Sequence, residues 1–490
     1  MPTSALTSGA PYGLPNSKVD AEPTPGMAPP RLEVRAGVRG EQPPVDLRPF
    51  RGITYNPAQV DNLFTLLAPP YDVISPQEQE GYHQQHPHNV VRLIYGREEA
   101  GDTAEDNRYT RAAHYLRSWL RHGVLQRDAA PSMYLCAEQY LLPDGTQRER
   151  QGLIALCRLE PYERGIILPH EETSPVPKRM LFDLRSAVEA NLSQIFALYA
   201  DDTGKLQEIL AAQRRQPPRL SFRDQDHMLH RVWAVSNPSL LTEIRQVMAA
   251  NWALIADGHH RYETCLAYQQ MRRQRTPPTS GEEWFDFAML YLTDIHDPGL
   301  TILPTHRVLR GLPPALVRQI PTRLSASCEV DALGFHTAAE RDAQCRRLTH
   351  EMRRRSAQAH VFGLYTGEDT LWLLTYRGAP PAAAPSTAGA GGDGSALDVS
   401  LLHTVLLEQM LGVDVHEDMF AYTQDDVEAL DLVSRREYQL AFLLSPTRIE
   451  QVVQQATAGR RMPRKSTYFY PKLLTGIVIH QEVGDADHVR

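Results

Sequence analysis

The chain has 490 residues, of which 42% are hydrophobic and 22% are charged, the balance of an ordinary globular protein. This length allows about two to four domains, and no apolar run approaches the roughly 18–20 residues that a membrane-spanning helix needs. The net charge of −8 is the opposite of the basic balance typical of nucleic-acid-binding domains. We therefore expect no membrane span and no nucleic-acid partner, while the oligomeric state stays open.

The five cysteines stand far apart and form no Cys-x-x-Cys pair. This spacing argues against a disulfide framework and against a cysteine-based zinc site. The N-terminal segment MPTSALTSGAPYGLPNSK lacks the charged and then apolar regions of a secretory signal. Together these features predict a cytoplasmic protein with reduced thiols.

Two stretches differ in composition from the rest of the chain. Residues 1–44 contain nine prolines and few large apolar residues, which predicts a disordered tail. Residues 379–396 are rich in Pro, Ala and Gly, which predicts a flexible linker or loop. The remaining chain divides into a candidate phosphate- or nucleotide-binding α/β domain over 45–310, an α/β extension over 311–378 and a C-terminal α/β segment over 397–490.

Helical and strand-like patterns alternate along the chain. The periodicity predicts helices over residues 107–122, 182–191, 262–275, 338–356, 400–411 and 448–458. Strand-like apolar runs occupy residues 133–142, 152–159, 194–200, 252–258, 287–294, 300–309, 360–366, 371–377 and 441–446. This alternation favours an α/β or α+β fold with mixed sheets, whose strand order the pattern does not determine.

The sharpest local pattern is WALIADGHHR, in which a short apolar strand ends at Asp257. Gly258 permits a tight turn, and His259, His260 and Arg261 open a helix. The free N–H groups of a helix start attract phosphate, and a guanidinium suits phosphate oxygens. Asp257 is a candidate Mg²⁺ ligand or proton acceptor, and either histidine is a candidate proton carrier. The alternative is a charged turn with structurally satisfied histidines.

The segment LPHEETSPVPKR, residues 168–179, is a second candidate. His170 or Glu171 would act as the general base for an alcohol, and Lys178 would bind phosphate. Prolines at 169, 175 and 177 would keep the segment extended and rigid. The alternative is a solvated loop.

The segment RMPRKSTYFYPKLLTG, residues 461–476 and here called the KST segment, combines cations with hydroxyls. Lys465, Ser466, Thr467 and Lys472 are candidate phosphate ligands, although the spacing is not that of a Walker A loop. Of 51 basic residues only five are lysines, so a lysine inside a motif weakly marks a position that needs a compact ammonium. The alternative is a strand edge protected by lysines.

Two shorter motifs lie elsewhere. Asp72 in LAPPYDVIS would hold a metal or a substrate amine, or would serve equally well as a turn or cap acceptor. Thr305, His306 and Arg307 in LPTHRVL stand at a predicted strand end as weaker candidates.

The turn Gly258-His259-His260-Arg261 resembles the glycine-x-x-arginine signature of the ParB/sulfiredoxin-like fold, which binds nucleotide or phosphate at this helix start. The acidic-Gly-x-His-Arg turn of the free L-serine kinases is the nearest form. Sulfiredoxins carry a nucleophilic cysteine where this chain has His259, so cysteine-based repair is not expected. The chromosome-partitioning CTPases, with Glu-Arg there, differ as well.

A second resemblance extends from Asp46 to His480. The segments DLRPFRGITYNP, LLAPPYDVIS, NVVRLIYG, ADGHHRYETCLAY, DPGLTILPTHRVL, MPRKSTYFYPKLLTG and the long run from LPHEETSPVPKR to IFALYAD resemble a bacterial family catalogued as domain of unknown function 1015. The resemblance implies a ParB/sulfiredoxin-like core with an additional α/β lobe. It also implies a relation to a proposed pyrophosphate-dependent serine kinase.

The leading hypothesis is Mg²⁺-dependent phosphoryl transfer from a nucleotide or pyrophosphate to a small hydroxyl compound, L-serine by resemblance. Such transfer needs cations around the phosphates and a base near the hydroxyl. One alternative is a non-enzymatic nucleotide-binding regulatory module of ParB type. Another is a phosphohydrolase with a metal on His259, His260 and Asp257. For a shared site, residues 170–178 and the KST segment must meet the turn at residues 257–261.

We predict that deletion of residues 1–44 leaves the melting temperature and any activity unchanged, because such a composition buries too little apolar surface to contribute to a core. Thermal unfolding of the full and shortened chains tests this, and a large fall in melting temperature would show that the tail packs on the remaining chain.

Overall fold

The computed structural model describes residues 45–275, 282–378 and 397–481. The chain divides into two units, Met1–Arg35 and Ala36–Arg490, and all described residues belong to the second. The predicted tail 1–44 and linker 379–396 lie outside the described residues. No helix in the described ranges is both long and apolar enough to cross a membrane.

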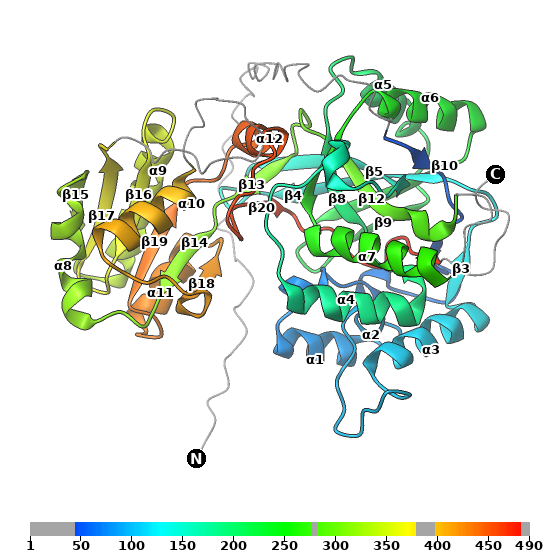
Figure 1. The fold of residues 1–490 in the computed structure, drawn as a ribbon, viewed down its shortest axis with the longest axis horizontal. Helices are drawn as coiled ribbons and strands as arrows, with labels where there is room; N and C mark the ends of the chain where they lie inside the picture. The colour runs from blue at the N-terminus through cyan, green and yellow to red at the C-terminus, as the bar shows by residue number, and fades with distance from the viewer. Residues whose placement is uncertain (1–44, 276–281, 379–396, 482–490) are drawn as a thin grey trace. The chain divides into compact units, whose positions relative to one another are not determined.

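The largest sheet has nine strands in the order β6-β11-β8-β12-β5-β4-β10-β9, with β1 also paired to β5 (Figure 1). Its strands are β1 (Leu47–Arg48), β4 (Met133–Leu141), β5 (Gln147–Arg158), β6 (Ile167–Leu168), β8 (Ile195–Tyr199), β9 (Leu220–Arg223), β10 (Leu229–Val235), β11 (Ala253–Asp257) and β12 (Phe287–Asp294). The pairs β11–β6 and β12–β8 are parallel and the others are antiparallel. The predicted α+β architecture with mixed sheets is confirmed.

A second sheet has six strands in the order β15-β17-β16-β19-β14-β18. They are β14 (His306–Leu309), β15 (Cys328–Gly334), β16 (Val361–Tyr365), β17 (Thr370–Tyr376), β18 (Phe420–Thr423) and β19 (Leu440–Leu444). Three two-stranded ladders complete the set: β2 (Ile53–Tyr55) with β3 (Leu125–Arg127), β7 (Ala190–Asn191) with β21 (His480–Gln481), and β13 (Thr301–Leu303) with β20 (Tyr468–Tyr470).

Helices flank these sheets. The α-helices are α1 (Pro76–Gln85), α2 (Val91–Ile94), α3 (Arg108–Arg121), α4 (Pro175–Val188), α5 (Lys205–Gln213), α6 (Pro238–Ala249), α7 (His259–Arg275), α8 (Pro314–Leu324), α9 (Ala338–Arg355), α10 (Asp398–Ser400), α11 (Asp426–Ser434) and α12 (Ile449–Thr457). Short 3₁₀-helices are η1 (Leu63–Leu66), η2 (Tyr71–Val73), η3 (Tyr162–Arg164), η4 (Trp284–Asp286) and η6 (Glu417–Met419), and η5 (Leu401–Met410) is a π-helix.

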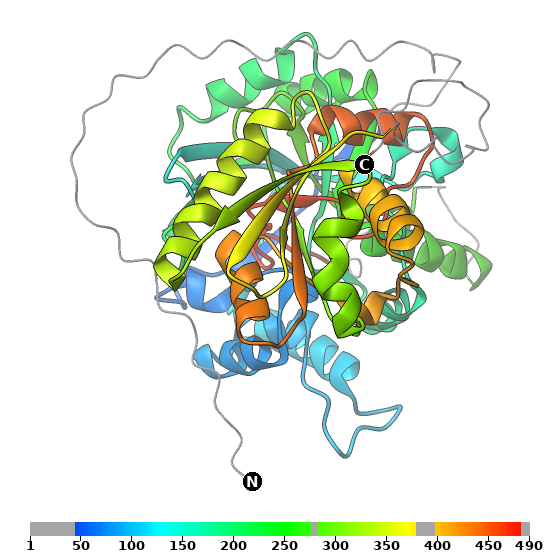
Figure 2. The ribbon, with the colours of Figure 1, turned by 90° about the vertical axis from the view of Figure 1, so that its left-hand side faces the viewer.

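The central strands β16 and β19 of the six-stranded sheet are buried on both faces, because their apolar residues follow one another without alternation. In β16, Phe362 and Leu364 face a core formed with α8 and η5, whereas Val361 and Tyr365 face a core formed with α9 and α11 (Figure 2). Successive side chains of a strand point to opposite faces, so a continuous apolar run fills two cores at once.

The predicted run 300–309 is two strands rather than one. Pro304 separates β13 from β14, and a proline cannot donate to a sheet ladder. β13 pairs with β20 of the KST segment, whereas β14 enters the six-stranded sheet. That sheet takes its strands from residues 306–444, across the expected segment boundaries at 311 and 397, and the chain after it returns beside β13 (Figure 1).

The segment after residue 174 is helical, in contrast to the extended conformation that its prolines predict. Pro175 instead occupies the first turn of α4, where its missing N–H would have had no helical partner in any case. The helix ends at Val188, so the predicted helix 182–191 both begins and ends earlier. α4 packs between α7 and α3 (Figure 1).

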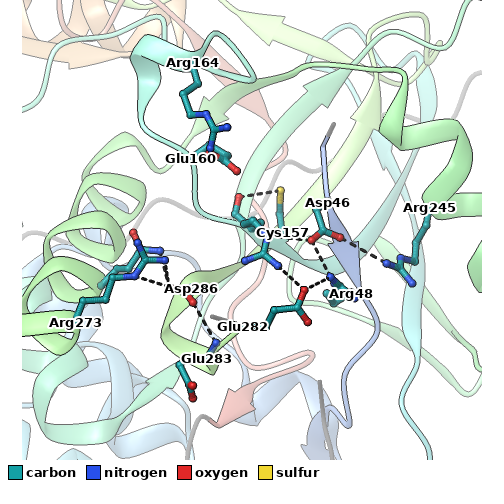
Figure 3. A network of polar contacts seen from close by, with 12 residues as sticks. Asp46, Arg48, Cys157, Glu160, Arg164, Arg245, Arg273, Glu282, Glu283 and Asp286 are labelled. Carbon is teal, nitrogen blue, oxygen red and sulfur yellow. Dashed lines mark hydrogen bonds and ion pairs between the residues drawn. The ribbon is translucent and has the colours of Figure 1, made fainter. Parts of the chain in front are cut away.

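A set of ion pairs ties β1 to the end of β5, an interior strand of the large sheet (Figure 3). Asp46 accepts a hydrogen bond from Arg158 at 3.0 Å, and Glu282 accepts bonds from Arg48 at 2.8 Å and from Arg158 at 3.0 Å. Arg245 of α6 lies 3.7 Å from Asp46. These side chains are partly exposed, so the network orients the strand more than it stabilises the fold.

A second ion pair lies inside the large sheet. Arg150 is fully buried, donates to Glu138 through Nε at 2.9 Å, and donates to the carbonyl oxygen of Pro471 at 2.9 Å. The Arg150 guanidinium also lies over the ring of Phe196, 4.8 Å from its centroid. Arg150 of the large sheet thus binds the KST segment through the backbone of Pro471.

We predict that Glu138→Ala lowers the free energy of unfolding by about 3–5 kcal/mol, because it leaves the Arg150 charge buried without its carboxylate. Denaturant titration measures the loss. Asp183→Ala is the matched control, since its partner Arg179 is 81% exposed and such pairs contribute about 1 kcal/mol or less. Equal losses in the two variants would contradict a special role for the buried pair.

Candidate functional site

The predicted strand–turn–helix at residues 253–261 is present. β11 ends at Asp257, and α7 begins at His259, where the turn pattern predicted a helix start, although the periodicity marked the helix only from residue 262. Gly258 joins them with a φ of +98°, and a Cβ at this position would lie 3.0 Å from the Arg261 guanidinium. Glycine adopts this backbone angle without strain and has no Cβ to approach the arginine, which explains why a glycine occupies the turn.

The three segments predicted to meet do meet. Met462 N donates to His170 O at 2.7 Å, Thr467 Oγ1 lies 3.1 Å from Glu171 Oε1, and Lys472 Nζ lies 2.8 Å from Asp257 Oδ2. These contacts join residues about 290 and 215 positions apart in the chain. The KST segment therefore lies against both the loop at residues 170–174 and the turn before α7.

The carboxylate of Asp257 is held between two cations. Besides Lys472, Arg261 Nη2 lies 3.7 Å from Asp257 Oδ1. Burial alone would raise the pKa of Asp257, but Lys472 and Arg261 outweigh it and keep that pKa well below its usual range. Burial alone would likewise lower the pKa of Lys472, but Asp257 and the exposed Asp72 raise it. The pair stays ionised throughout the neutral range.

Arg261 is oriented by groups that no motif indicated. Its Nη1 donates to the carbonyl oxygen of Gln194 and lies 3.4 Å from Ser193 Oγ. Beside it, a small pocket of about 60 Å³ is lined by Tyr71, Ser193 and apolar residues of α4. Ser193 and Gln194 lie in a short loop before β8, and no residue pattern distinguishes such contacts in the sequence.

The buried histidine His259 orders the loop at residues 170–171. His259 Nε2 lies 3.2 Å from the backbone N of His170 and 3.4 Å from that of Glu171, so it accepts their N–H groups. Burial, together with the neighbouring His170, lowers the pKa of His259 well below its ordinary value. His259 is therefore a neutral hydrogen-bond acceptor whose Nε2 already binds two backbone N–H groups, so this atom does not donate a hydrogen bond to a phosphate.

His260 is engaged in a similar way. Its Nε2 accepts the N–H of Ser174 at 3.0 Å, which fixes the residue that precedes α4. Burial and the charge of Arg464 lower the pKa of His260. Lys178, on the first turns of α4, lies 3.0 Å from Glu263 of α7, so its predicted phosphate role competes with this ion pair.

Glu171 keeps one carboxylate oxygen available. Its Oε1 is within 3.3 Å of Thr467 N and within 3.1 Å of Thr467 Oγ1, whereas Oε2 has no hydrogen-bond partner in the described ranges. The Glu171 side chain is 20% exposed. His170, in contrast, is fully buried, so of the two predicted bases only Glu171 can reach a substrate directly.

Lys465 and Ser466 form the tip of the KST segment. Lys465 adopts a left-handed backbone with φ of 58° and is exposed, and its ammonium forms no hydrogen bond or ion pair in the part of the chain that is described. Ser466 is buried, and its hydroxyl donates to Pro463 O at 2.5 Å. The Ser466 hydroxyl thus shapes the turn, while the Lys465 ammonium stays open to solvent.

A buried arginine lies behind this tip. Arg307 of β14 is 1% exposed and donates to the carbonyl oxygens of Thr305 and Lys465, the latter at 2.8 Å. Among the described residues no carboxylate pairs with it, and its Nε has no partner. Burial lowers the pKa of Arg307 to about 10, so its charge persists at neutral pH and adds positive potential to the KST segment.

The neighbours of Arg307 in the LPTHRVL motif serve the fold. His306 lies 2.7 Å from Asp426, and its Nδ1 accepts the N–H of Leu444. The first contact ties β14 to α11 and the second ties it to β19, so in the described residues His306 serves the fold and Arg307 is the residue of this motif that contacts the KST segment.

The side chains at this site are not arranged to hold a resident metal ion. In the described ranges no group of three or more His, Cys, Asp or Glu side chains is placed to hold one. Asp257 is neutralised by Lys472 and Arg261, and the Nε2 atoms of His259 and His260 bind backbone N–H groups. The metal centre expected for a phosphohydrolase on these residues is not formed.

We predict that Asp257→Asn lowers the free energy of unfolding at pH 7 by about 1.5–3 kcal/mol, the scale of a charged hydrogen bond. Because the folded-state pKa is depressed, this stabilisation exists above the unfolded pKa of about 3.9 and is lost as pH falls below it. Denaturant titrations between pH 3 and 8 should show the two proteins converging in acid, and a constant difference would contradict the ion pair.

Comparisons with known proteins supply a family but no curated relative, since no curated protein matches this chain. The solved structures that match include a free serine kinase in complex with AMP, 12% identical, with a TM-score of 0.30 over 62% of this chain and 84% of that one. A conserved hypothetical protein from Pyrococcus furiosus is 14% identical, with a TM-score of 0.28 over 62% and 87%.

A third match, SbnI with a C-terminal truncation from Staphylococcus aureus, is 10% identical, with a TM-score of 0.29 over 66% and 85%. TM-scores this low do not establish a shared fold, so the ParB/sulfiredoxin-like core and its phosphate-binding turn stay predictions. The family match is extensive by contrast. Over residues 47–400 the sequence matches the family described as Protein of unknown function (DUF1015), and the chain belongs to that family.

Proposed function

We propose that this protein is a phosphotransferase that moves a phosphoryl group from a nucleotide or pyrophosphate to a small hydroxyl compound. One observation carries the proposal: the KST segment brings cations and hydroxyls onto the start of α7 and onto the carboxylate of Glu171. Phosphoryl transfer asks a protein for little covalent chemistry, but it needs positive charge around the phosphates and a base at the acceptor hydroxyl.

The phosphate groups of the donor would bind at the start of α7. The first N–H groups of a helix lack helical partners and carry a partial positive charge. Arg261 and Lys472 contact Asp257 just before this helix start, and the exposed Lys465 would follow a phosphate chain into solvent. Arg307 adds a buried charge from behind. The ordered cations would neutralise charge that develops in the transition state.

Glu171 would be the general base. Its Oε1 is fixed by the backbone of Thr467, which leaves Oε2 to accept the proton of an acceptor hydroxyl. A fixed carboxylate loses little conformational entropy on binding, which favours the aligned geometry that proton transfer requires. The acceptor class, a small hydroxyl compound such as L-serine, rests on the family resemblance.

His259, His260 and His170 would act as positioning residues. The first two are neutral and bind backbone N–H groups at residues 170, 171 and 174, so they fix the loop that carries Glu171. Mg²⁺ would enter with the phosphate donor as part of the substrate, because Mg²⁺ commonly keeps waters and phosphate oxygens as ligands.

The proposal predicts distinct effects for two site variants. Glu171→Gln should lower the turnover rate about 10²- to 10⁴-fold while leaving donor affinity nearly unchanged. Lys465→Met should weaken donor affinity by about 1.5–3 kcal/mol, the range of a charged hydrogen bond, with a smaller effect on turnover. Transfer from Mg–ATP or Mg–pyrophosphate to L-serine and other small alcohols, together with calorimetric titration of the donor, measures both quantities.

Lys205→Met is the matched control, because Lys205 is an exposed lysine on α5 that pairs only loosely with Glu208 at 3.8 Å. Donor binding without transfer to any acceptor would contradict the phosphotransferase and favour the nucleotide-responsive module. Loss of affinity in Lys205→Met equal to that in Lys465→Met would show that general charge, not the site, binds the donor.

A further inference from the structure

Thr467 and His170 form a hydroxyl–imidazole pair that the proposed reaction does not use. Thr467 Oγ1 lies 2.9 Å from His170 Nε2, and His170 Nδ1 lies 2.7 Å from the carbonyl oxygen of Ile255. A hydroxyl, a base within hydrogen-bond reach and a third group that orients the base are the parts of an activated nucleophile.

The partners determine where the protons are. A carbonyl oxygen only accepts, so His170 Nδ1 carries the hydrogen and the neutral ring presents a lone pair at Nε2. The single hydrogen of Thr467 Oγ1 therefore lies between two acceptors, His170 Nε2 at 2.9 Å and Glu171 Oε1 at 3.1 Å. His170 is fully buried, so solvent does not compete for this bond, and the ring cannot rotate without losing its bond to β11.

Glu171 supplies the charge that a proton transfer would require. Its Oε1 lies 3.9 Å from His170 Nε2, and an anion at that distance stabilises an imidazolium formed there. The same oxygen accepts the backbone N–H of Thr467, so the peptide group by itself already connects the two segments. The Thr467 hydroxyl adds a second bond to this oxygen, but the backbone bond does not depend on it.

Thr467 is also close to positive charge. It directly follows the turn of Lys465 and Ser466, behind which Arg307 is buried. Thr467 is partly exposed, whereas His170 is fully buried. A phosphate group bound along the KST segment would thus meet a hydroxyl whose proton already has an acceptor.

We propose that Thr467 is itself phosphorylated by the bound donor, a nucleoside triphosphate or pyrophosphate, when no acceptor is present. Thr467 Oγ attacks the terminal phosphorus, and its proton passes to His170 Nε2. The new O–P bond forms as the bridging P–O bond breaks, and the electron pair of that bond leaves with the nucleoside diphosphate or orthophosphate. This inference shares the donor site of the proposed function but needs neither Glu171 Oε2 nor a small acceptor.

The test is to incubate the full chain with Mg–ATP, and separately with Mg–pyrophosphate, in the absence of any alcohol. Intact-mass spectrometry should show the gain of one phosphoryl group, and peptide fragmentation should place it on Thr467. Thr467→Val should abolish the gain and Thr467→Ser should retain it. Thr475→Val is the matched control, because Thr475 is 1% exposed and its hydroxyl has no hydrogen-bond partner among the described residues.

Phosphate on another residue, or an unmodified wild-type chain that binds the donor, would overturn the proposal. Thermal unfolding of each variant separates loss of the hydroxyl from loss of the fold, and the site mapped in the wild-type chain decides the matter if Thr467→Val does not fold. Transfer to small alcohols, assayed in parallel, keeps the two proposals apart: transfer without phospho-Thr467 refutes only this inference, and phospho-Thr467 without transfer refutes only the small-molecule activity.

Discussion

The ion pair between Lys472 and Asp257 is the contact on which the site depends. It joins the C-terminal KST segment to the turn between β11 and α7, and both partners are mostly buried, with side chains 16% and 19% exposed. Because each charge would be costly to bury alone, the two segments are held in one register. That register in turn sets Thr467 against Glu171, and so determines which groups a ligand at the helix start would meet.

Two buried arginines support the KST segment from opposite sides. Arg150 of the large sheet donates to Pro471 O, and Arg307 of the six-stranded sheet donates to Lys465 O. Arg150 pairs with the carboxylate of Glu138, whereas Arg307 donates to carbonyl oxygens and has no carboxylate partner among the described residues. The difference is physically meaningful, because an unpaired buried cation is tolerated where it lowers the energy of nearby negative charge, here Glu171 and any phosphate bound along the segment.

The three histidines illustrate how burial changes a chemical role. Each of His170, His259 and His260 has a pKa below its ordinary value because of burial, so each is a neutral ring at pH 7. His259 and His260 use Nε2 to accept backbone N–H groups, which turns two residues that resemble proton carriers into supports for a loop. His170 differs because its Nε2 meets a side-chain hydroxyl. Two of the three histidines thus support a loop through backbone N–H groups, and the third contacts a side-chain hydroxyl.

The sequence by itself determined the α+β class, the strand–turn–helix around Gly258 and the identity of the segments that carry polar function, because these depend on local periodicity and on glycine's backbone freedom. It also led to the hypothesis that residues 170–178 and 461–476 meet the turn, because phosphoryl transfer needs a base and more positive charge than the turn alone supplies. It did not determine that run 300–309 splits between two sheets, that α4 begins at Pro175, or that Ser193, Gln194 and Arg307 orient the site. Those features depend on contacts between residues far apart in the chain, such as Arg307 with Lys465, and only the tertiary structure decides which donors and acceptors are already used.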